Sequence, residues 1–290
     1  MTEADDLAAW AAGAIREFLD NSPENTLGNL AGEKAWDDFL AGFSRGDDSL
    51  YPDYKRYVGP YHWTPLEIFS ITFPDIPADP AELSVISWIL PQREVTKADN
   101  RREGTFPAER WLRSRILGER CNKALRAHLE SALIRMGFPA VAPMLSPEWA
   151  RKDSDTYTYA STWSERHAAY AAGLGTFGLS DGLITPKGKA VRVGSVVVKA
   201  EIPPTPRPYT DHHAYCLFFT RGICGKCIQR CPVGAITEKG HEKVSCRDYV
   251  RGAASEHART SYNFDGYGCG LCQTAVPCES KIPVPEDVSY

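Results

Sequence analysis

The sequence predicts an α/β (α+β) protein in which a larger domain of mixed helix and strand precedes a small cysteine-rich domain. Three observations carry this prediction. An apolar run at 84–90 (SVISWIL), ended by Pro91, has the length and composition of a buried strand, and a long helical stretch follows at about 107–136. Eight of the nine cysteines lie in one stretch, 216–278. A proline-rich segment (EIPPTPRP) separates the two parts of the chain.

Residues 1–80 are expected to form a helical and aromatic region that packs on the core. The N-terminal stretch MTEADDLAAWAAGAIREFLD predicts a helix, and it lacks the basic segment and continuous apolar core of a signal peptide. We therefore expect a cytoplasmic protein. No run of ~18 or more apolar residues occurs, so a membrane partner is not expected. The net charge of −4 and the pI near 6.0 give no electrostatic reason to expect nucleic acid as a partner.

Residues 81–207 are predicted to form the mixed domain, and residues 208–290 the cysteine-rich domain. Within the mixed domain, SERHAAYAA at 164–172 predicts a helix, and a short strand is expected at 141–144. Two β-rich runs flank a Pro-Lys-Gly turn in LSDGLITPKGKAVRVGSVVV, which predicts an antiparallel hairpin.

Three glycines, Gly173, Gly175 and Gly178, spell the G-x-G-x-x-G pattern of dinucleotide sites. That pattern requires a strand before it and a helix after it, whereas here a helical stretch precedes and a strand-like stretch follows. A dinucleotide site is therefore not expected. Two interpretations stay open: the glycines permit a tight turn from helix to strand, or they let the backbone approach a bound cofactor closely.

The cysteine-rich domain opens with CLFFTRGICGKCIQRCP at 216–232. Cys224, Cys227 and Cys231, with the proline that follows, form the C-x2-C-x3-C-P part of a bacterial ferredoxin run. Only Cys216 is displaced upstream, by a longer loop. In such runs the fourth cysteine binds the other cluster.

A second cysteine set follows, in which GCGLC resembles the C-x2-C part of another run. Exchange of the fourth cysteines between the two runs predicts two 4Fe-4S clusters. The first cluster would take Cys216, Cys224, Cys227 and Cys278. The second would take Cys231, Cys246, Cys269 and Cys272. Cys278 departs from the usual spacing, and zinc or a disulfide framework stays as an alternative for these thiols.

The motif ERHAAYAAGLGTFGLSDGLITPKG, the linker and then CxxCxxxCPVGAI resemble epoxyqueuosine reductases and reductive dehalogenases over roughly residues 80–280. The resemblance implies a nitroreductase-like domain that holds base-off cobalamin, followed by a ferredoxin-like domain with two 4Fe-4S clusters. It also implies an oxidoreductase that takes electrons from a ferredoxin or flavodoxin type of donor and cleaves a small organic substrate reductively.

The same resemblance singles out two tyrosines as candidate proton donors. An ungapped match puts Tyr159 where epoxyqueuosine reductases carry an acidic catalytic residue, and reductive dehalogenases use a tyrosine as proton donor. Tyr157 is the neighbouring candidate for the same role. The alternative for both tyrosines is a purely structural role, in which their rings pack in a loop. His62, His167 and the pair at 212–213 are candidate axial or acid–base groups, with a structural role as the alternative.

Two functions from other classes stay open at this point. The chain could be an electron-transfer protein that reduces a partner, such as a corrinoid protein, without substrate chemistry of its own. Alternatively, the clusters could be structural or regulatory beside a binding module. The size of the part that precedes the cysteines favours the enzyme.

Overall fold

The computed structural model describes residues 3–29, 31–154 and 157–288. Its centre is a four-stranded sheet in which each neighbouring pair of strands is antiparallel. The strand order is β1 (Leu40–Arg45), β2 (Leu83–Pro91), β8 (Val191–Lys199) and β3 (Ala140–Val141). The predicted strand at 84–90 is thus β2, the inner strand between β1 and β8. The mixed composition of helix and sheet is as predicted.

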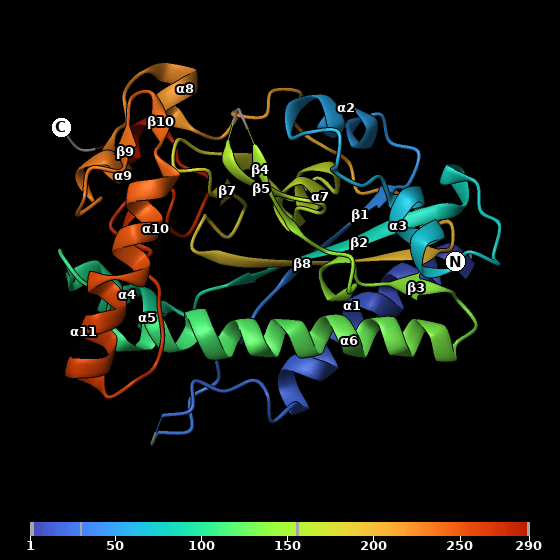
Figure 1. The fold of residues 1–290 in the computed structure, drawn as a ribbon, viewed down its shortest axis with the longest axis horizontal. Coiled ribbons are helices and arrows are strands. Elements are labelled where there is room, and N and C mark those ends of the chain that lie inside the picture. The colour runs from blue at the N-terminus through green and yellow to red at the C-terminus, as the bar shows by residue number, and fades with distance from the viewer. Residues whose placement is uncertain (1–2, 30, 155–156, 289–290) are drawn as a thin grey trace.

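The sheet is covered by helices on both faces, because successive side chains of a strand point to opposite sides. From β2, Ile86 and Trp88 join a core with α1 (Glu3–Asn21) and α6 (Glu119–Arg135), whereas Val85 and Ile89 pack on the other face. Figure 1 shows α6 running beneath the sheet, with α7, α2 and α3 above it. These three helices span Glu165–Ala171, Leu50–Tyr57 and Pro65–Thr72.

The predicted helix at 107–136 is a continuous helical rod with an irregular turn inside it. It consists of α5 (Glu109–Arg113), a π-helical turn (Ser114–Gly118) and α6. A π-helical turn inside an α-helix is rare and frequently marks a functional site. The shorter helix α4 (Glu94–Arg102) precedes the rod.

The predicted hairpin at the Pro-Lys-Gly turn is reduced to a single antiparallel bridge, in which Thr185 and Gly188 exchange backbone hydrogen bonds. β7 (Leu183–Ile184) pairs with β6 (Thr176–Phe177), whereas the valine-rich run that follows becomes β8 and pairs with β2 over all nine residues. Burial between two helical layers accounts for this choice, since it removes more apolar surface than a local hairpin would. The predicted strand at 141–144 is limited to the two residues of β3, and a 3-10 turn (Pro143–Leu145) follows.

The remaining elements of the mixed part lie around this sheet. A two-stranded hairpin, β4 (Arg151–Ser154) with β5 (Thr158–Ser161), stands beside α7. A 3-10 turn (Pro80–Glu82) precedes β2. β8 is paired with β3 only at Val197 and Val198, so among the described residues 191–196 have no strand on the side away from β2.

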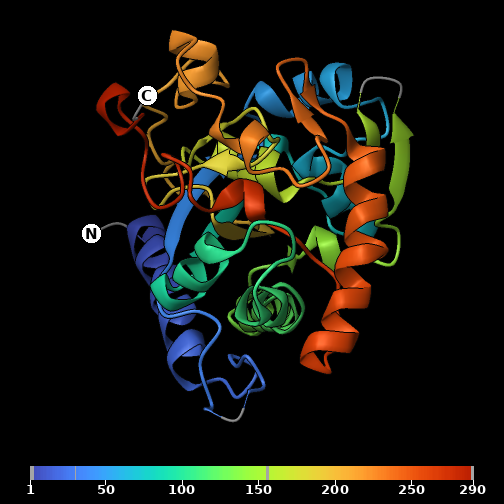
Figure 2. The same cartoon turned by 90° about the vertical axis from the view of Figure 1, so that its left-hand side faces the viewer.

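The cysteine-rich part packs against one end of the mixed part (Figure 2). Its regular elements are α8 (Leu217–Arg221), α9 (Lys226–Gln229), β9 (Ile236–Thr237), β10 (Gly240–His241), α10 (Lys243–Arg251), α11 (Ala253–Tyr262) and two 3-10 turns (Leu271–Gln273, Pro285–Asp287). The Arg230 guanidinium ties the parts together, since it donates to the carbonyls of Asn100 and Glu103. In the part of the chain that the structure describes, no helix is both long and apolar enough to cross a membrane.

Candidate metal centres

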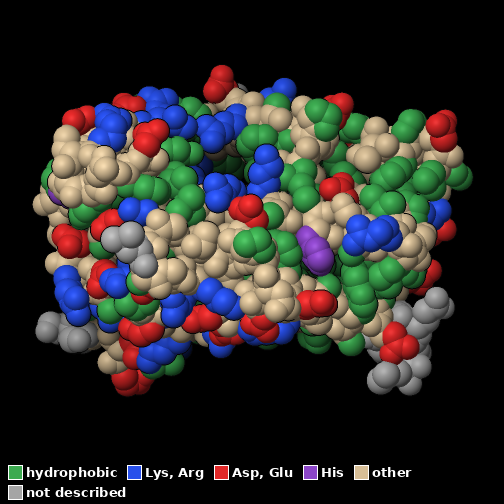
Figure 3. Space-filling model, turned by 90° about the horizontal axis from the view of Figure 1, so that it is seen from below, with side chains coloured by type: hydrophobic (Ala, Val, Ile, Leu, Met, Phe, Trp, Pro, Cys, Tyr) green, Lys and Arg blue, Asp and Glu red, His purple; other side chains and the backbone are tan. Residues whose placement is uncertain are grey.

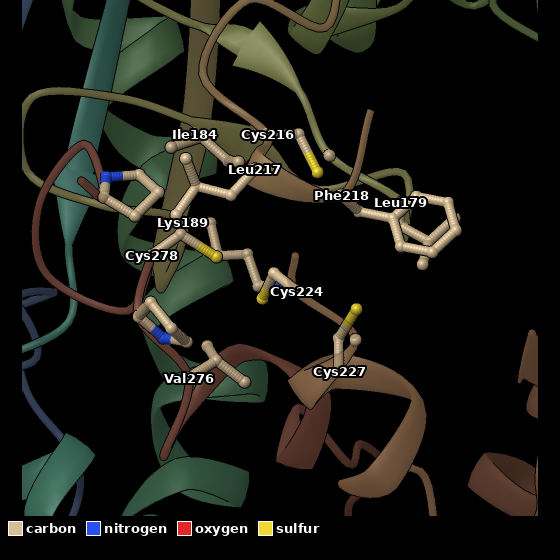
Figure 4. A pocket seen from close by; sticks show the side chains of 14 residues that line it. Leu179, Ile184, Lys189, Cys216, Leu217, Phe218, Cys224, Cys227, Val276 and Cys278 are labelled. Atoms are coloured by element: carbon tan, nitrogen blue, oxygen red, sulfur yellow. The ribbon is translucent and has the colours of Figure 1, made fainter. Parts of the chain in front are cut away.

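Four of the predicted ligands line one cavity in the cysteine-rich part. The volume of the cavity is about 20 Å³, and it is partly open to solvent. The cavity is drawn in Figure 4, and its cysteines come from three segments. Cys216 caps the start of α8, Cys224 and Cys227 lie at and within the start of α9, and Cys278 comes from the C-terminal loop. These four are the predicted first set.

The other four cysteines, all partly buried, gather around the loop GCGLC. Cys231 follows α9, Cys246 lies in α10, and each is close enough to Cys272 that its negative charge raises the pKa of that thiol. Burial is the larger cause, and it raises the pKa of Cys272 to about 11 and that of Cys269 to about 12. This grouping corresponds to the predicted second set.

The chemistry of both sets suits thiolate-bound clusters. Burial raises the pKa of Cys278 to about 11, so this thiol stays protonated at neutral pH unless a cation compensates its charge. Iron of a cluster supplies that compensation, because a coordinating thiol is deprotonated. Among the described residues, no three His, Cys, Asp or Glu side chains converge at the spacing of a single-ion site. The assignment of a metal to these thiols is therefore a proposal.

Lys189 is the charged residue that lies between the two sets. Its side chain lines the cavity near Cys278 and is 3% exposed, and its Nζ donates to Ser180 Oγ at 3.0 Å. Burial lowers the pKa of Lys189, but once the nearby thiols are deprotonated their negative charges, that of Cys278 first, raise it above the usual value. Cys272 of the second set acts on Lys189 in the same sense. The positive charge of the buried Lys189 ammonium therefore acts on cysteines of both sets.

The C-terminal loop holds Cys278 in place in spite of its unusual spacing. Glu279 is buried, pairs with Arg101 of α4 at 2.6 Å and accepts a hydrogen bond from the backbone of Ala275. The backbone N–H of Lys189 donates to the Cys278 carbonyl at 2.8 Å. These contacts explain how five residues, in place of three, can separate the last two cysteines.

The candidate proton donors lie on the hairpin that faces α10. Tyr159 is on β5, and the Arg247 guanidinium donates to its hydroxyl and lies 5.3 Å from its ring centre. Tyr157 is 40% exposed, with the Lys243 ammonium 5.0 Å from its ring centre. Both tyrosines therefore stand at the boundary between the mixed part and the cysteine-rich part.

The glycine motif is filled by the protein's own backbone. A Cβ on Gly173 would lie 2.6 Å from the Pro206 carbonyl oxygen, and one on Gly175 would lie 2.3 Å from that of Ile184. Gly173 also has a positive φ of 76°. At Gly178 the nearest atom would be an Ile184 side-chain carbon at 3.1 Å. Of the two open interpretations, close chain packing at a tight turn explains these contacts; a role in holding a cofactor stays a prediction.

The candidate histidines occupy structural surroundings. His62 is 1% exposed, neither ring nitrogen has a hydrogen-bond partner among the described residues, and burial lowers its pKa to about 4. His167 contacts Ser164 through Nδ1 at 2.7 Å and packs against Tyr54. His213 contacts the Phe177 carbonyl and stacks on Phe219. These contacts are those of packed side chains.

A buried ionic network, which sequence reasoning did not identify, crosses the open edge of β8. Arg126 of α6 donates to Glu165 Oε1 at 2.8 Å and to the Val193 carbonyl at 3.0 Å, and the Ser195 hydroxyl donates to Glu165. Arg192 lies beside this network. The sequence carried one signal of it, since an arginine interrupts the apolar run AVRVGSVVV.

Basic side chains also gather around a hollow on one face of the molecule, as Figure 3 shows.

Along α10, three cations recur every four residues and so share one face of the helix: Lys243, Arg247 and Arg251. Each lies over an aromatic ring. The third ring is that of Tyr267, 5.2 Å from the Arg251 guanidinium.

Comparison with known proteins supports the predicted resemblance. No family model matches the chain. Two curated relatives, the epoxyqueuosine reductases of Bacillus anthracis and Bacillus cereus, are each 32% identical over 119 residues. The matched stretch is 39% of this chain and 29% of each relative. The chain therefore matches less than a third of the length of these relatives.

Solved structures share the fold. A reductive dehalogenase whose structure suggests a mechanism for B12-dependent dehalogenation has a TM-score of 0.50 at 14% identity, covering 86% of this chain and 31% of that one. A catabolic reductive dehalogenase in complex with 3-bromo-4-hydroxybenzoic acid has a TM-score of 0.50 at 15% identity, covering 97% and 38%. The predicted resemblance is thus confirmed. The epoxyqueuosine reductases share sequence with this chain, and the reductive dehalogenases share its fold.

One expectation about partners is wrong. An epoxyqueuosine reductase solved with an epoxyqueuosine-modified tRNA-Tyr stem loop is similar to this chain, with a TM-score of 0.49 and 18% identity, covering 99% of this chain and 70% of that one. Nucleic acid therefore cannot be set aside as a partner. The expectation rested on the net charge of −4, which averages over the whole surface and hides local basic patches such as that of Figure 3.

Proposed function

We propose that this chain, which resembles epoxyqueuosine reductases and reductive dehalogenases, is an iron–sulfur reductase that passes electrons through two 4Fe-4S clusters to a corrinoid. The observation that carries the proposal is the division of eight buried or partly buried cysteines into two sets of four, side by side next to the mixed part. Two adjacent one-electron carriers form a conduit, and a conduit requires an acceptor. The mixed part is large enough to hold that acceptor.

The first cluster would be held by Cys216, Cys224, Cys227 and Cys278, and the second by Cys231, Cys246, Cys269 and Cys272. When bound, they would supply one-electron transfer. The protein's part is to keep water away from the thiolates and to compensate their charge. Burial of Cys216 and Cys227, and partial burial of the other six cysteines, supports the first task, and the Lys189 ammonium supports the second.

The corrinoid, for which cobalamin is the proposed form, would lie against the open edge of β8. Cobalt would supply the reductant for bond cleavage. The fit rests on this edge, because a strand without a neighbour offers backbone N–H and C=O groups to a ligand rich in amides. On that side the Val193 carbonyl is already taken by Asn122 and Arg126 of α6, so the ligand would meet the other backbone groups of 191–196.

Tyr159 is the proposed proton donor. Reductive cleavage consumes two electrons and a proton, and a phenol can supply the proton. The contact with Arg247 fixes the orientation of the Tyr159 hydroxyl and can stabilise the phenolate left after transfer. Tyr157 beside Lys243 is the second candidate.

The substrate is a small organic group, and one observation favours a group carried on nucleic acid. The three cation–aromatic contacts along α10 alternate positive charge with aromatic faces. Proteins that bind single-stranded nucleic acid use such a combination for phosphates and stacked bases. Anisotropy of a labelled RNA stem loop, titrated at two salt concentrations, tests this choice against a free small molecule.

The decisive experiment determines what the purified protein holds. Anaerobic protein is assayed for iron and acid-labile sulfide, then incubated with cobalamin and desalted, and cobalt is measured. We expect about eight irons per chain and retained cobalt. A protein with eight irons that retains no corrinoid would be an electron carrier, and a protein that binds zinc in place of iron would refute the proposal altogether.

A further inference from the structure

We propose that Arg115, Arg192 and Arg251 form a binding site for an oxyanion, a phosphate or carboxylate group, between the mixed part and the cysteine-rich part. The three come from different elements: Arg115 from the π-helical turn, Arg192 from the start of β8, and Arg251 from the end of α10. No role in the proposed electron path requires them.

Arg192 is a cation whose one carboxylate partner among the described residues is distant. Its side chain is 24% exposed, and its ion pair, with Glu119 Oε2, is long at 3.8 Å. Among the described residues its guanidinium makes no hydrogen bond. Burial, and next the positive charge of Arg115, lowers the pKa of Arg192 to about 9. An arginine in this condition lacks the planar acceptor that its five donors fit best.

Arg115 and Arg251 meet at the ring of Tyr267. Each guanidinium lies 5.2 Å from the ring centre. Neither forms an ion pair with a carboxylate in the described ranges. The stem of Arg115 packs against Gly268, where an added Cβ would lie 3.1 Å from Arg115 Cγ. The π-helical turn therefore directs Arg115 to the loop that carries Cys269.

The local charges do not balance. Besides the three proposed ligands, Arg126 faces the same region, so four arginines stand against the two carboxylates Glu119 and Glu165. Both carboxylates are already engaged by Arg126, at 3.0 and 2.8 Å. Arg115 and Arg192 are partly buried, whereas Arg251 is exposed at the rim. Partly buried cations that lack a counterion destabilise a fold, so the arrangement of Arg115 and Arg192 is best explained by an anion that binds beside them, within reach of Arg251.

The ligand class follows from the donors. Guanidinium groups bind phosphate and carboxylate oxygens in pairs, with charge-assisted hydrogen bonds. Such a group could belong to the cofactor or to the substrate, and the two sources share this chemistry.

The test measures binding of inorganic phosphate and of acetate to the whole purified chain by calorimetry. We expect Arg192→Gln and Arg251→Gln each to weaken binding about tenfold or more. The matched control is Arg120→Gln in α6, since Arg120 is 62% exposed and paired with Glu24 on the surface. The control should bind as the unchanged protein does.

A second measurement guards against misfolding. In anion-free buffer Arg192→Gln should melt no lower than the unchanged protein, and added phosphate should raise only the latter's melting temperature. Equal phosphate affinity in Arg192→Gln and Arg120→Gln, or no binding of either anion by the unchanged chain, would overturn the site.

The source of the anion is decided by competition. If phosphate displaces cobalamin but not cobinamide, which lacks the phosphate, the site serves the cofactor. If phosphate binds together with both corrinoids, the site serves the substrate. Because anion binding is measured without turnover, loss of the proposed redox function would leave this result unchanged.

Discussion

Replacement of Lys189 by Met should lower the reduction potential of the proposed first cluster. The Lys189 ammonium is 3% exposed and lines the same cavity as four cysteines, so it acts on them through a medium of low polarisability. With an effective dielectric constant of ~20 and separations of roughly 5–10 Å, a unit charge contributes roughly 2–3 kcal/mol. Reduction adds negative charge, which the ammonium stabilises, so its loss makes reduction harder.

The expected shift is therefore downward by roughly 90–130 mV, taking 59 mV for each tenfold change in a one-electron equilibrium. Potentiometric titration followed by electron paramagnetic resonance measures it. Lys187→Met is the matched control, because Lys187 lies two residues away but is 43% exposed and paired with Asp38 at 2.7 Å. The reasoning is refuted if Lys189→Met retains its iron and the two variants titrate at the same potential.

Three further predictions concern the cysteine sets and the core. Cys278→Ala should lose about half of the iron, whereas Cys121→Ala, outside both sets, should lose none; equal iron contents would remove Cys278 from the ligands. Gly270→Ala should disturb the second set, because its Cβ would lie 2.1 Å from a tryptophan ring. The control Gly222→Ala has a similar positive φ but open space around it, so it should lower the free energy of unfolding by only about 1 kcal/mol. Iron content and melting temperature compare the two variants, and equal losses would contradict the steric argument. Burial lowers the pKa of His62 to about 4 in the folded protein, so the folded state is fully stable above the unfolded value of ~6.5 and loses free energy of unfolding as the pH falls towards 4. His62→Phe should reduce this loss by ~2 kcal/mol at pH 5, as measured by urea unfolding. An unchanged pH dependence would refute the assignment.

The sequence predicted those features that depend on local pattern. The apolar run of β2, the long helix with its stop at Gly137, and the spacing around Cys224 and Cys227 each carry a local signal. The residues of a strand carry no local signal of which other strand it pairs with. The pairing of β7 with β6 and the position of β1 at the edge of the sheet could therefore not be derived.

The charged part of the site depends on distant contacts. Arg126 and Glu165 are 39 residues apart in the chain, and the two helices that carry them, α6 and α7, pack on the sheet through apolar faces. The π-helical turn at Ser114–Gly118 likewise has no signature in its residues. The sequence could therefore locate the cysteine sets, but not the arginines beside them.

The open edge of β8 also bears on how the chain avoids self-association. An exposed, valine-rich strand edge is a template for pairing with a strand of another molecule, and natural proteins cover such edges or place charge on them. Here Asn122 and Arg126 occupy the Val193 carbonyl with side-chain hydrogen bonds, both at 3.0 Å. Arg192 adds charge at the same edge. If α6 separates from the sheet, or if no ligand covers the open edge of β8, the chain should consequently be more prone to aggregate than the ligand-bound protein.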